Sequence, residues 1–209
     1  TVQQRGAAII SAGTVRGLGA IGADSPIVTS EAKGGPIAIV GLAIRLPGAS
    51  DLDGLWNRLL AASDTTSEVP PERFPVALLG TAPRRAGFLA DVATFDAERY
   101  GLSPREALPL DPQHRLLLEL AYEALERSGD GGDTLRGSRT GVFVGVPPSH
   151  WMRRFPGDEL YTDVYAGTGN ESSFAAGRIA HLLGLRGPVV ALNTACSSSL
   201  VAVHEAVRA

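Results

Sequence analysis

Three short apolar runs, separated by longer stretches with helical spacing, constrain the fold of this chain more than any other feature. The runs are residues 37–41, 141–146 and 189–192, and Ile, Val and Ala dominate them. Strands that are apolar at nearly every position are typical of a sheet covered on both faces. Alternation of such strands with helices favours the α/β class. We therefore expect an α/β fold with a sheet buried between helices.

The first helix is expected just after residue 50. Ser50 is the predicted N-cap, and Asp51 and Asp53 lie in the first turn, where negative charge complements the helix dipole. The apolar side chains that follow recur at helical spacing and form one stripe: Leu52, Leu55, Trp56, Leu59 and Leu60.

The clearest helix begins after Asp111, with Pro112 at its first position and Gly129 at its end. Two further helices are expected at residues 172–183 and 197–209. Residues 63–109 are rich in Pro and read as a long loop region, which in a compact domain usually serves a function or an interface.

Residues 1–35 are rich in Gly, Ala and Ser and lack a sustained helical or strand period. We interpret them as a linker or the tail of a preceding domain, with the ordered domain beginning at Pro36. Residues 17–22 fit the pattern G-x-G-x-x-G, but no strand directly precedes them and Pro26 prevents a useful helix. A flexible linker is therefore favoured over a dinucleotide site. Residues 167–170 (GTGN) are expected to form a turn before the next helix.

Charge and composition exclude several partners. The net charge of -3 gives no basic surface, so nucleic acid is not expected to bind. No apolar run reaches the roughly 20 residues that a membrane helix needs. A single cysteine fits a reducing, cytoplasmic location and cannot complete a zinc site with four histidines that lack ligand spacing. No metal and no directly bound cofactor are expected.

The single cysteine, Cys196, lies where a strand turns sharply into a helix (residues 193–199, NTACSSS). Small neighbours permit the turn, and the N-terminus of a buried helix would lower the thiol pKa from about 8.5 toward neutral. Its N–H groups could also bind the oxyanion of an attacked thioester. The alternative is a buried, inert cysteine that acts as a small hydrophobe. These local features leave both interpretations open.

A series of short motifs follows in order between Pro36 and Ala209. They are PIAIVG (36–41), RLPGA (45–49), VPPERF (69–74), GFL (87–89), GLSPREA (101–107), DPQHRLLLE (111–119), GVFVG (141–145), AGRI (176–179), GLRGP (184–188) and TACSSSL (194–200). In this order they resemble the β-ketoacyl synthase (ketosynthase) domain of type I polyketide synthases. The last of them matches that family's active-site motif.

The resemblance implies a thiolase-like fold, layered α/β/α/β/α, of which residues 36–209 would be the N-terminal half, ending shortly after the nucleophile. It implies that Cys196 accepts an acyl chain from the phosphopantetheine arm of an acyl carrier protein, with its own backbone N–H in the oxyanion hole. A malonyl-type thioester then extends the chain by decarboxylative condensation. The resemblance further implies a homodimer that works with other synthase domains.

This chain departs from the family pattern at a few places. Asn193 stands where the motif usually has Asp, Ile44 where Cys is frequent, and Tyr122 where Trp is frequent. None of the four histidines, His114, His150, His181 and His204, matches the family's two catalytic histidines, which lie downstream of the nucleophile. Two alternatives therefore stay open: a non-catalytic scaffold or dimerisation remnant of such a synthase, and a condensing enzyme of the fatty acid type.

Overall fold

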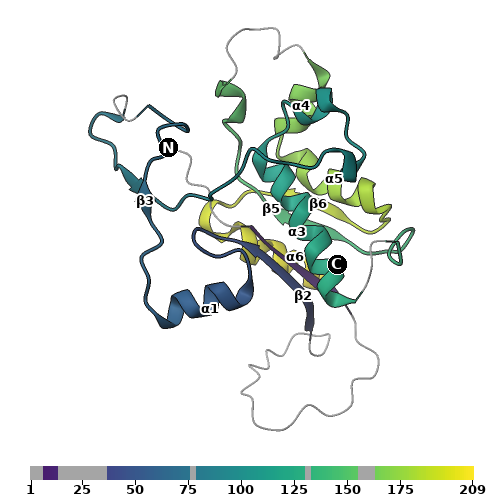
Figure 1. The fold of residues 1–209 in the computed structure, drawn as a ribbon. Helices are drawn as coiled ribbons and strands as arrows, with labels where there is room; N and C mark the ends of the chain where they lie inside the picture. Colours follow the sequence, from purple (N-terminus) through teal and green to yellow (C-terminus); the bar gives the residue numbers. More distant parts are fainter. Residues whose placement is uncertain (1–6, 14–36, 76–78, 130–132, 155–162) are drawn as a thin grey trace.

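The structure is a computed structural model, and it describes residues 7–13, 37–75, 79–129, 133–154 and 163–209 (Figure 1). The α-helices and strands in chain order are β1 (Ala7–Gly13), β2 (Ala38–Arg45), α1 (Leu52–Leu60), β3 (Ser67–Glu68), β4 (Arg85–Ala86), α2 (Pro104–Ala107), α3 (Pro112–Ser128), β5 (Val142–Gly145), α4 (Val164–Asn170), α5 (Ser173–Leu183), β6 (Val189–Leu192) and α6 (Ser198–Arg208). The mixture of helices and strands confirms the α/β class.

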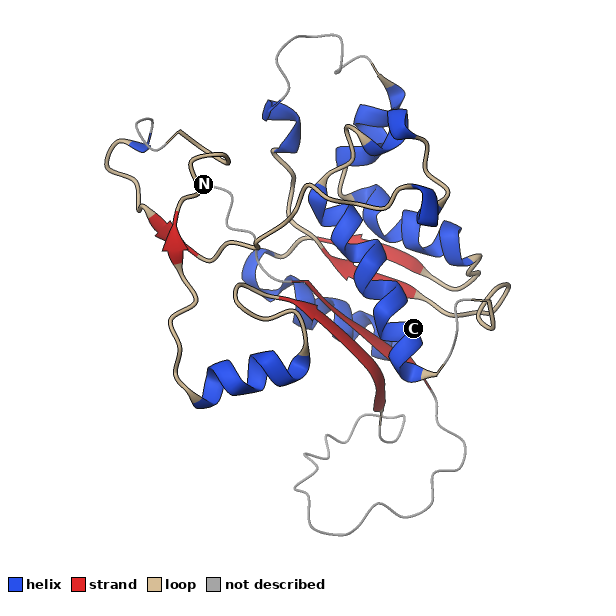
Figure 2. Cartoon of the chain, in the orientation of Figure 1, coloured by secondary structure: helices blue, strands red, loops and turns tan. Residues whose placement is uncertain are grey.

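The strands of the described residues form three separate pairs, shown in red in Figure 2. β5 and β6 are parallel, with Val142 opposite Val189, whereas β1 pairs with β2, and β3 with β4, in antiparallel fashion. The three apolar runs therefore do not share one sheet among the described residues. Helices α5 and α6 both contact the β5–β6 pair, whereas β2 is not covered along its whole length, because Ala43 is fully buried while Ile39 is 62% exposed.

β1 lies within residues 1–35, in which the sequence shows no sustained helical or strand period. It pairs along β2 from Ala7 opposite Arg45 to Gly13 opposite Ala38. Backbone pairing needs only an open strand edge, so it can form without the apolar period that sequence patterns detect. The assignment of residues 1–35 to a linker or tail stays a prediction, and the pattern at residues 17–22 lies outside the described residues.

Helix α1 corrects the predicted cap. Asp51, not Ser50, is the N-cap, and its carboxylate accepts a hydrogen bond of 2.7 Å from the N–H of Gly54. The apolar stripe is present, but none of its residues is buried: Trp56 and Leu59 are each exposed by more than half of their surface. Helical spacing therefore predicted the helix correctly, but the apolar stripe is not buried against another described element.

Helix α3 confirms the sequence prediction at both ends. The Asp111 carboxylate accepts a hydrogen bond from the N–H of Gln113, Pro112 occupies the first turn, and Gly129 ends the helix with a φ of 80°. α3 packs against β1, β2 and α5 (Figure 1). The main core gathers residues of α3, α5 and the β5 region, with Tyr100: Leu117, Leu118, Ala121, Leu125, Val144, Val146, Ala175, Ala176, Ile179 and Leu183.

Residues 167–170 are the end of helix α4 and not the expected turn. The Asp163 carboxylate caps the helix by accepting a hydrogen bond from the N–H of Tyr165. The end of α4 lies against the start of α3, because the Asp111 N–H donates to the Gly169 carbonyl and the Asn170 amide donates to the Pro109 carbonyl. These tertiary hydrogen bonds hold a glycine-rich segment in a helix that its propensity disfavours.

His114 lies in this junction and is 2% exposed. Its Nδ1 has no hydrogen-bond partner among the described residues. Burial, and secondarily the positive charge of Arg178, lower the pKa of His114 to about 4. The folded protein therefore holds this imidazole neutral at pH values where the unfolded chain protonates it.

We predict a loss of stability between pH 6.5 and pH 4 that depends on His114. Above pH 6.5 the imidazole is neutral in both states, and the stabilisation is complete. As the pH falls through this window only the unfolded state takes up the proton, which costs about 3 kcal/mol by the bottom of the window. The measurement is hydrogen–deuterium exchange of α3 peptides in the full-length protein.

Replacing His114 with Gln should remove this pH-dependent loss, whereas replacing the exposed His204 with Gln should leave it in place. An unchanged pH dependence in His114→Gln would contradict the prediction.

Candidate active site

Cys196 is exposed and lies on the connection between β6 and α6, as its position in the sequence predicts. It occupies the middle of a short 3-10 turn, Ala195–Ser197, and α6 begins two residues later at Ser198. The expected burial of this helix is wrong: α6 buries only Ser198 and Ala202, and Leu200 is 77% exposed. The alternative of a buried, inert cysteine is excluded by the same exposure.

The turn that carries Cys196 is held in a strained conformation. Ala195 has a φ of 55°, which costs a residue with a Cβ atom about 1 kcal/mol. The Asn193 side-chain oxygen accepts a hydrogen bond of 3.0 Å from the Ala195 N–H. Asn193 therefore supplies a hydrogen-bond acceptor at the position where the family motif usually has Asp, without the negative charge of Asp.

Two serines close the turn from the other side. The Ser197 hydroxyl donates to the Thr194 carbonyl over 2.8 Å. The Ser198 hydroxyl donates to the Ala195 carbonyl and accepts from the Thr194 N–H, at 2.8 and 2.9 Å. The turn is thus fixed on both sides of Ala195, directly before Cys196.

β5 determines where this turn sits. The first turn of α6 lies so close to Gly145 that a Cβ atom there would be 2.7–2.9 Å from atoms of Ser198. The pairing of β5 and β6 continues past the strands, because the Val146 N–H donates to the Leu192 carbonyl over 3.0 Å. Sequence patterns alone assign no role to Ser198 or Gly145; the signal was a glycine at the end of an apolar strand, which often marks a close backbone approach.

The histidines of the sequence lie on other elements or farther along α6. His114 is buried at the start of α3, His181 lies exposed on α5, and His204 lies exposed on α6. Within the described ranges no group of three or more His, Cys, Asp or Glu residues could hold a metal ion. None of the described helices is long and apolar enough to cross a membrane.

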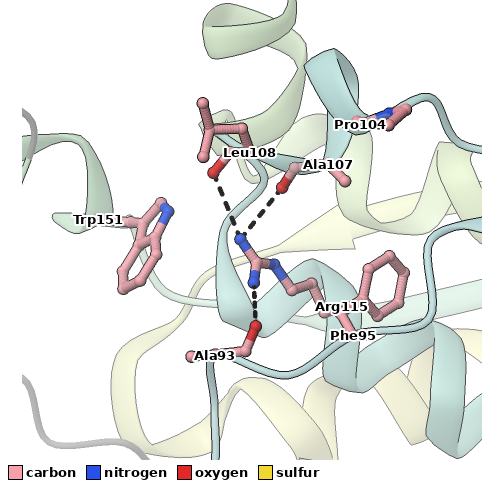
Figure 3. A pocket seen from close by; sticks show the side chains of 7 residues that line it. All are labelled: Ala93, Phe95, Pro104, Ala107, Leu108, Arg115 and Trp151. Carbon is pink, nitrogen blue, oxygen red and sulfur yellow. Dashed lines mark hydrogen bonds between the residues drawn. The ribbon is translucent and has the colours of Figure 1, made fainter.

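A cavity of about 470 Å³ lies elsewhere, around Arg115 (Figure 3). The Arg115 guanidinium lies between the rings of Phe95 and Trp151, 6.0 and 5.6 Å from their centroids. It donates to the carbonyls of Ala93 and Ala107 in the walls. Because this cation holds the surrounding loops through their main chain, we assign it a structural role, and Cys196 is not among the residues that line the cavity.

Known proteins resemble this chain in sequence over most of its length. Residues 35–209 match the model of the β-ketoacyl synthase N-terminal domain. One component of the phenolphthiocerol/phthiocerol polyketide synthase of Mycobacterium tuberculosis is 46% identical over 181 residues, which cover 81% of this chain and 12% of that protein. The pikromycin polyketide synthase component PikAII of Streptomyces venezuelae is 46% identical over 191 residues, or 86% of this chain and 5% of that protein.

Solved structures of ketosynthase domains also resemble this chain. The ketosynthase from module 6 of the bacillaene synthase of Bacillus subtilis 168 matches with a TM-score of 0.69 and 32% identity, over 80% of this chain and 27% of that one. The oxazolomycin ketosynthase domain OzmH KS7 of Streptomyces albus JA3453 matches with a TM-score of 0.71 and 34% identity, over 81% and 31%. These neighbours confirm the expected thiolase-like α/β fold.

The chain thus spans a small part of the polyketide synthases it matches and less than a third of each ketosynthase structure. The residues matched by the family model, 35–209, include Cys196. This chain belongs to the β-ketoacyl synthase family and corresponds to its N-terminal domain.

Proposed function

We propose that this chain provides the acyl-accepting nucleophile of a polyketide synthase condensing reaction, and that Cys196 is that nucleophile. The observation that carries the proposal is an exposed cysteine, held in a strained turn between a parallel strand and a helix, within a chain of the ketosynthase family. A transferase role follows from the family, and the acyl transfer to Cys196 is the finer step that we infer.

The loading step is a thioester exchange. The Cys196 thiol loses its proton to water, and the thiolate attacks the carbonyl carbon of an acyl thioester to form a tetrahedral oxyanion. The bond between that carbon and the phosphopantetheine sulfur then breaks, and the departing thiolate takes up a proton from water. The Cys196 backbone N–H, in the first turn before α6, is the proposed donor to the oxyanion.

The condensing step consumes this acyl group. A malonyl-type thioester loses carbon dioxide, and the enolate carbon attacks the acyl carbon on Cys196. The carbon–sulfur bond to Cys196 breaks, the cysteine thiolate is released, and the β-ketoacyl product stays on the carrier. The resemblance assigns the decarboxylation to two histidines downstream of the nucleophile, and no histidine of this chain matches their motifs.

The proposed partners follow from this chemistry. The phosphopantetheine arm belongs to an acyl carrier protein and brings the substrate, so this chain needs no resident cofactor for loading. The sequence relatives are polyketide synthases many times longer than this chain, which supports other synthase domains as further partners. A cytoplasmic location is proposed with them.

We also propose that the full-length protein is a homodimer. Of the described strands only β5 pairs with β6, so the other edge of β6 offers N–H and C=O groups to a further strand. Sedimentation velocity of the full-length protein should give twice the mass of one chain at micromolar concentration. A monomer under those conditions would refute the dimer.

Replacing Cys196 with Ala should abolish acyl loading. The full-length protein is mixed with an acyl thioester of N-acetylcysteamine, and its peptides are analysed by mass spectrometry. In the parent protein the acyl group should be found on Cys196. In Cys196→Ala the corresponding peptide should carry no acyl group. Ser199→Ala is the matched control, because Ser199 is exposed and lies in the same turn-to-helix segment. Equal chain elongation by Cys196→Ala and the parent protein would instead favour the scaffold alternative.

Two replacements of Asn193 should show whether its side-chain acceptor or its lack of charge matters for loading. Asn193→Ala removes the acceptor for the Ala195 N–H, so we expect the loading rate to fall by about threefold to tenfold. Asn193→Asp keeps the acceptor and should load within about twofold of the parent protein. The comparison uses single-turnover loading kinetics, and a loss in Asn193→Asp as large as in Asn193→Ala would contradict the interpretation.

A further inference from the structure

We propose that Ser198 is a positioning residue for the Cys196 nucleophile, acting through the turn at Thr194 and Ala195. The inference rests on the proposed function, since it assigns Ser198 a role in the loading step. Ser198 does not touch the reacting atoms in this proposal. It holds the main chain that carries them.

The Ser198 hydroxyl makes two hydrogen bonds to the main chain directly before the nucleophile. It accepts from the Thr194 N–H at 2.9 Å and donates to the Ala195 carbonyl at 2.8 Å. Both bonds span the residue whose φ is 55°, and they therefore hold the chain in the conformation that an alanine disfavours. One side chain thus fixes the direction in which the backbone enters Cys196.

Ser198 can hold the turn because its own position is fixed by the sheet. It is 7% exposed, whereas every other residue from Asn193 to Ser199 is exposed. Gly145 at the end of β5 lies in contact with Ser198, and no Cβ atom fits between them. The hydroxyl therefore transmits the position of β5 to the nucleophile turn.

The neighbouring serines differ in this respect. Ser197 also bonds to Thr194, but its hydroxyl lies on the exposed side of the turn. Ser199 is exposed, and no hydrogen bond of its side chain is present among the described residues. Of these three serines Ser198 is the one that joins the turn to the sheet, so the three should respond differently to replacement.

Because the turn is exposed, replacing Ser198 should affect the position of Cys196 more than the stability of the fold. If Ser198 is replaced by Ala, water can satisfy the Thr194 N–H and the Ala195 carbonyl, because both residues are exposed. The fold should therefore lose little, while the nucleophile gains freedom to leave its productive position. Displacement of a reacting group by about 1 Å costs up to about a hundredfold in rate.

The test compares Ser198→Ala with Ser199→Ala and Ser128→Ala in the full-length protein. Ser128→Ala removes a serine hydrogen bond at the end of α3 and reports the effect of such a loss away from the turn. Single-turnover loading from an acyl thioester of N-acetylcysteamine gives the transfer rate. Iodoacetamide alkylation of Cys196 as a function of pH reports the environment of the thiol independently.

We expect Ser198→Ala to load about tenfold to a hundredfold more slowly and its alkylation profile to move to higher pH, because the thiol drifts from the N-terminus of α6. Ser199→Ala and Ser128→Ala should stay within about twofold with unchanged profiles.

Two outcomes would overturn the proposal: loading by Ser198→Ala at the parent rate, or loss of hydrogen-exchange protection throughout α6, which would make the role structural. Failure of the proposed function looks different. In that case the parent protein itself carries no acyl group on Cys196, whatever residue occupies position 198.

Discussion

The parallel pairing of β5 with β6 is the constraint on which the position of Cys196 depends. It brings the ends of two strands that are distant in the sequence into register at Gly145 and Leu192. The chain leaves β6 and turns at once, and α6 returns across β5 at the one residue without a side chain. Any change that separates these strands would therefore move Cys196.

A second set of contacts holds the helices that pack on this pair. The Asp111 N–H donates to the Gly169 carbonyl and joins the start of α3 to the end of α4, while the ion pair of Arg178 with Glu106, at 2.6 Å, joins α5 to α2. α5 in turn packs against both β5 and β6. Hydrogen bonds between segments satisfy helix-end groups that a helix leaves unpaired, as where the Asp111 N–H donates to the Gly169 carbonyl.

Sequence patterns predicted the elements whose stability is local. α3 has its cap, its first-turn proline and its final glycine within its own residues, and β6 is apolar from Val189 to Leu192, so both were located correctly. The turn at Cys196 was predicted for the same reason. The exposure of α1 and α6, the pairing of β2 with β1 and the helical end of α4 could not be predicted, because each depends on contacts between distant segments. Ser198 belongs to this second class, since its role arises only where α6 meets β5.

The turn shows how one loop can be both exposed and ordered. A nucleophile that reacts with a carrier-bound thioester must be open to a large partner, so packing around its side chain cannot fix it. In this chain the order comes from hydrogen bonds of Asn193 and Ser198 to the main chain on either side of Ala195. Such bonds at the surface add little net stability, because water competes for both partners. They restrict instead the direction of the main chain that leads into Cys196. The reactivity of Cys196 and the stability of the fold should therefore respond separately to changes in this turn.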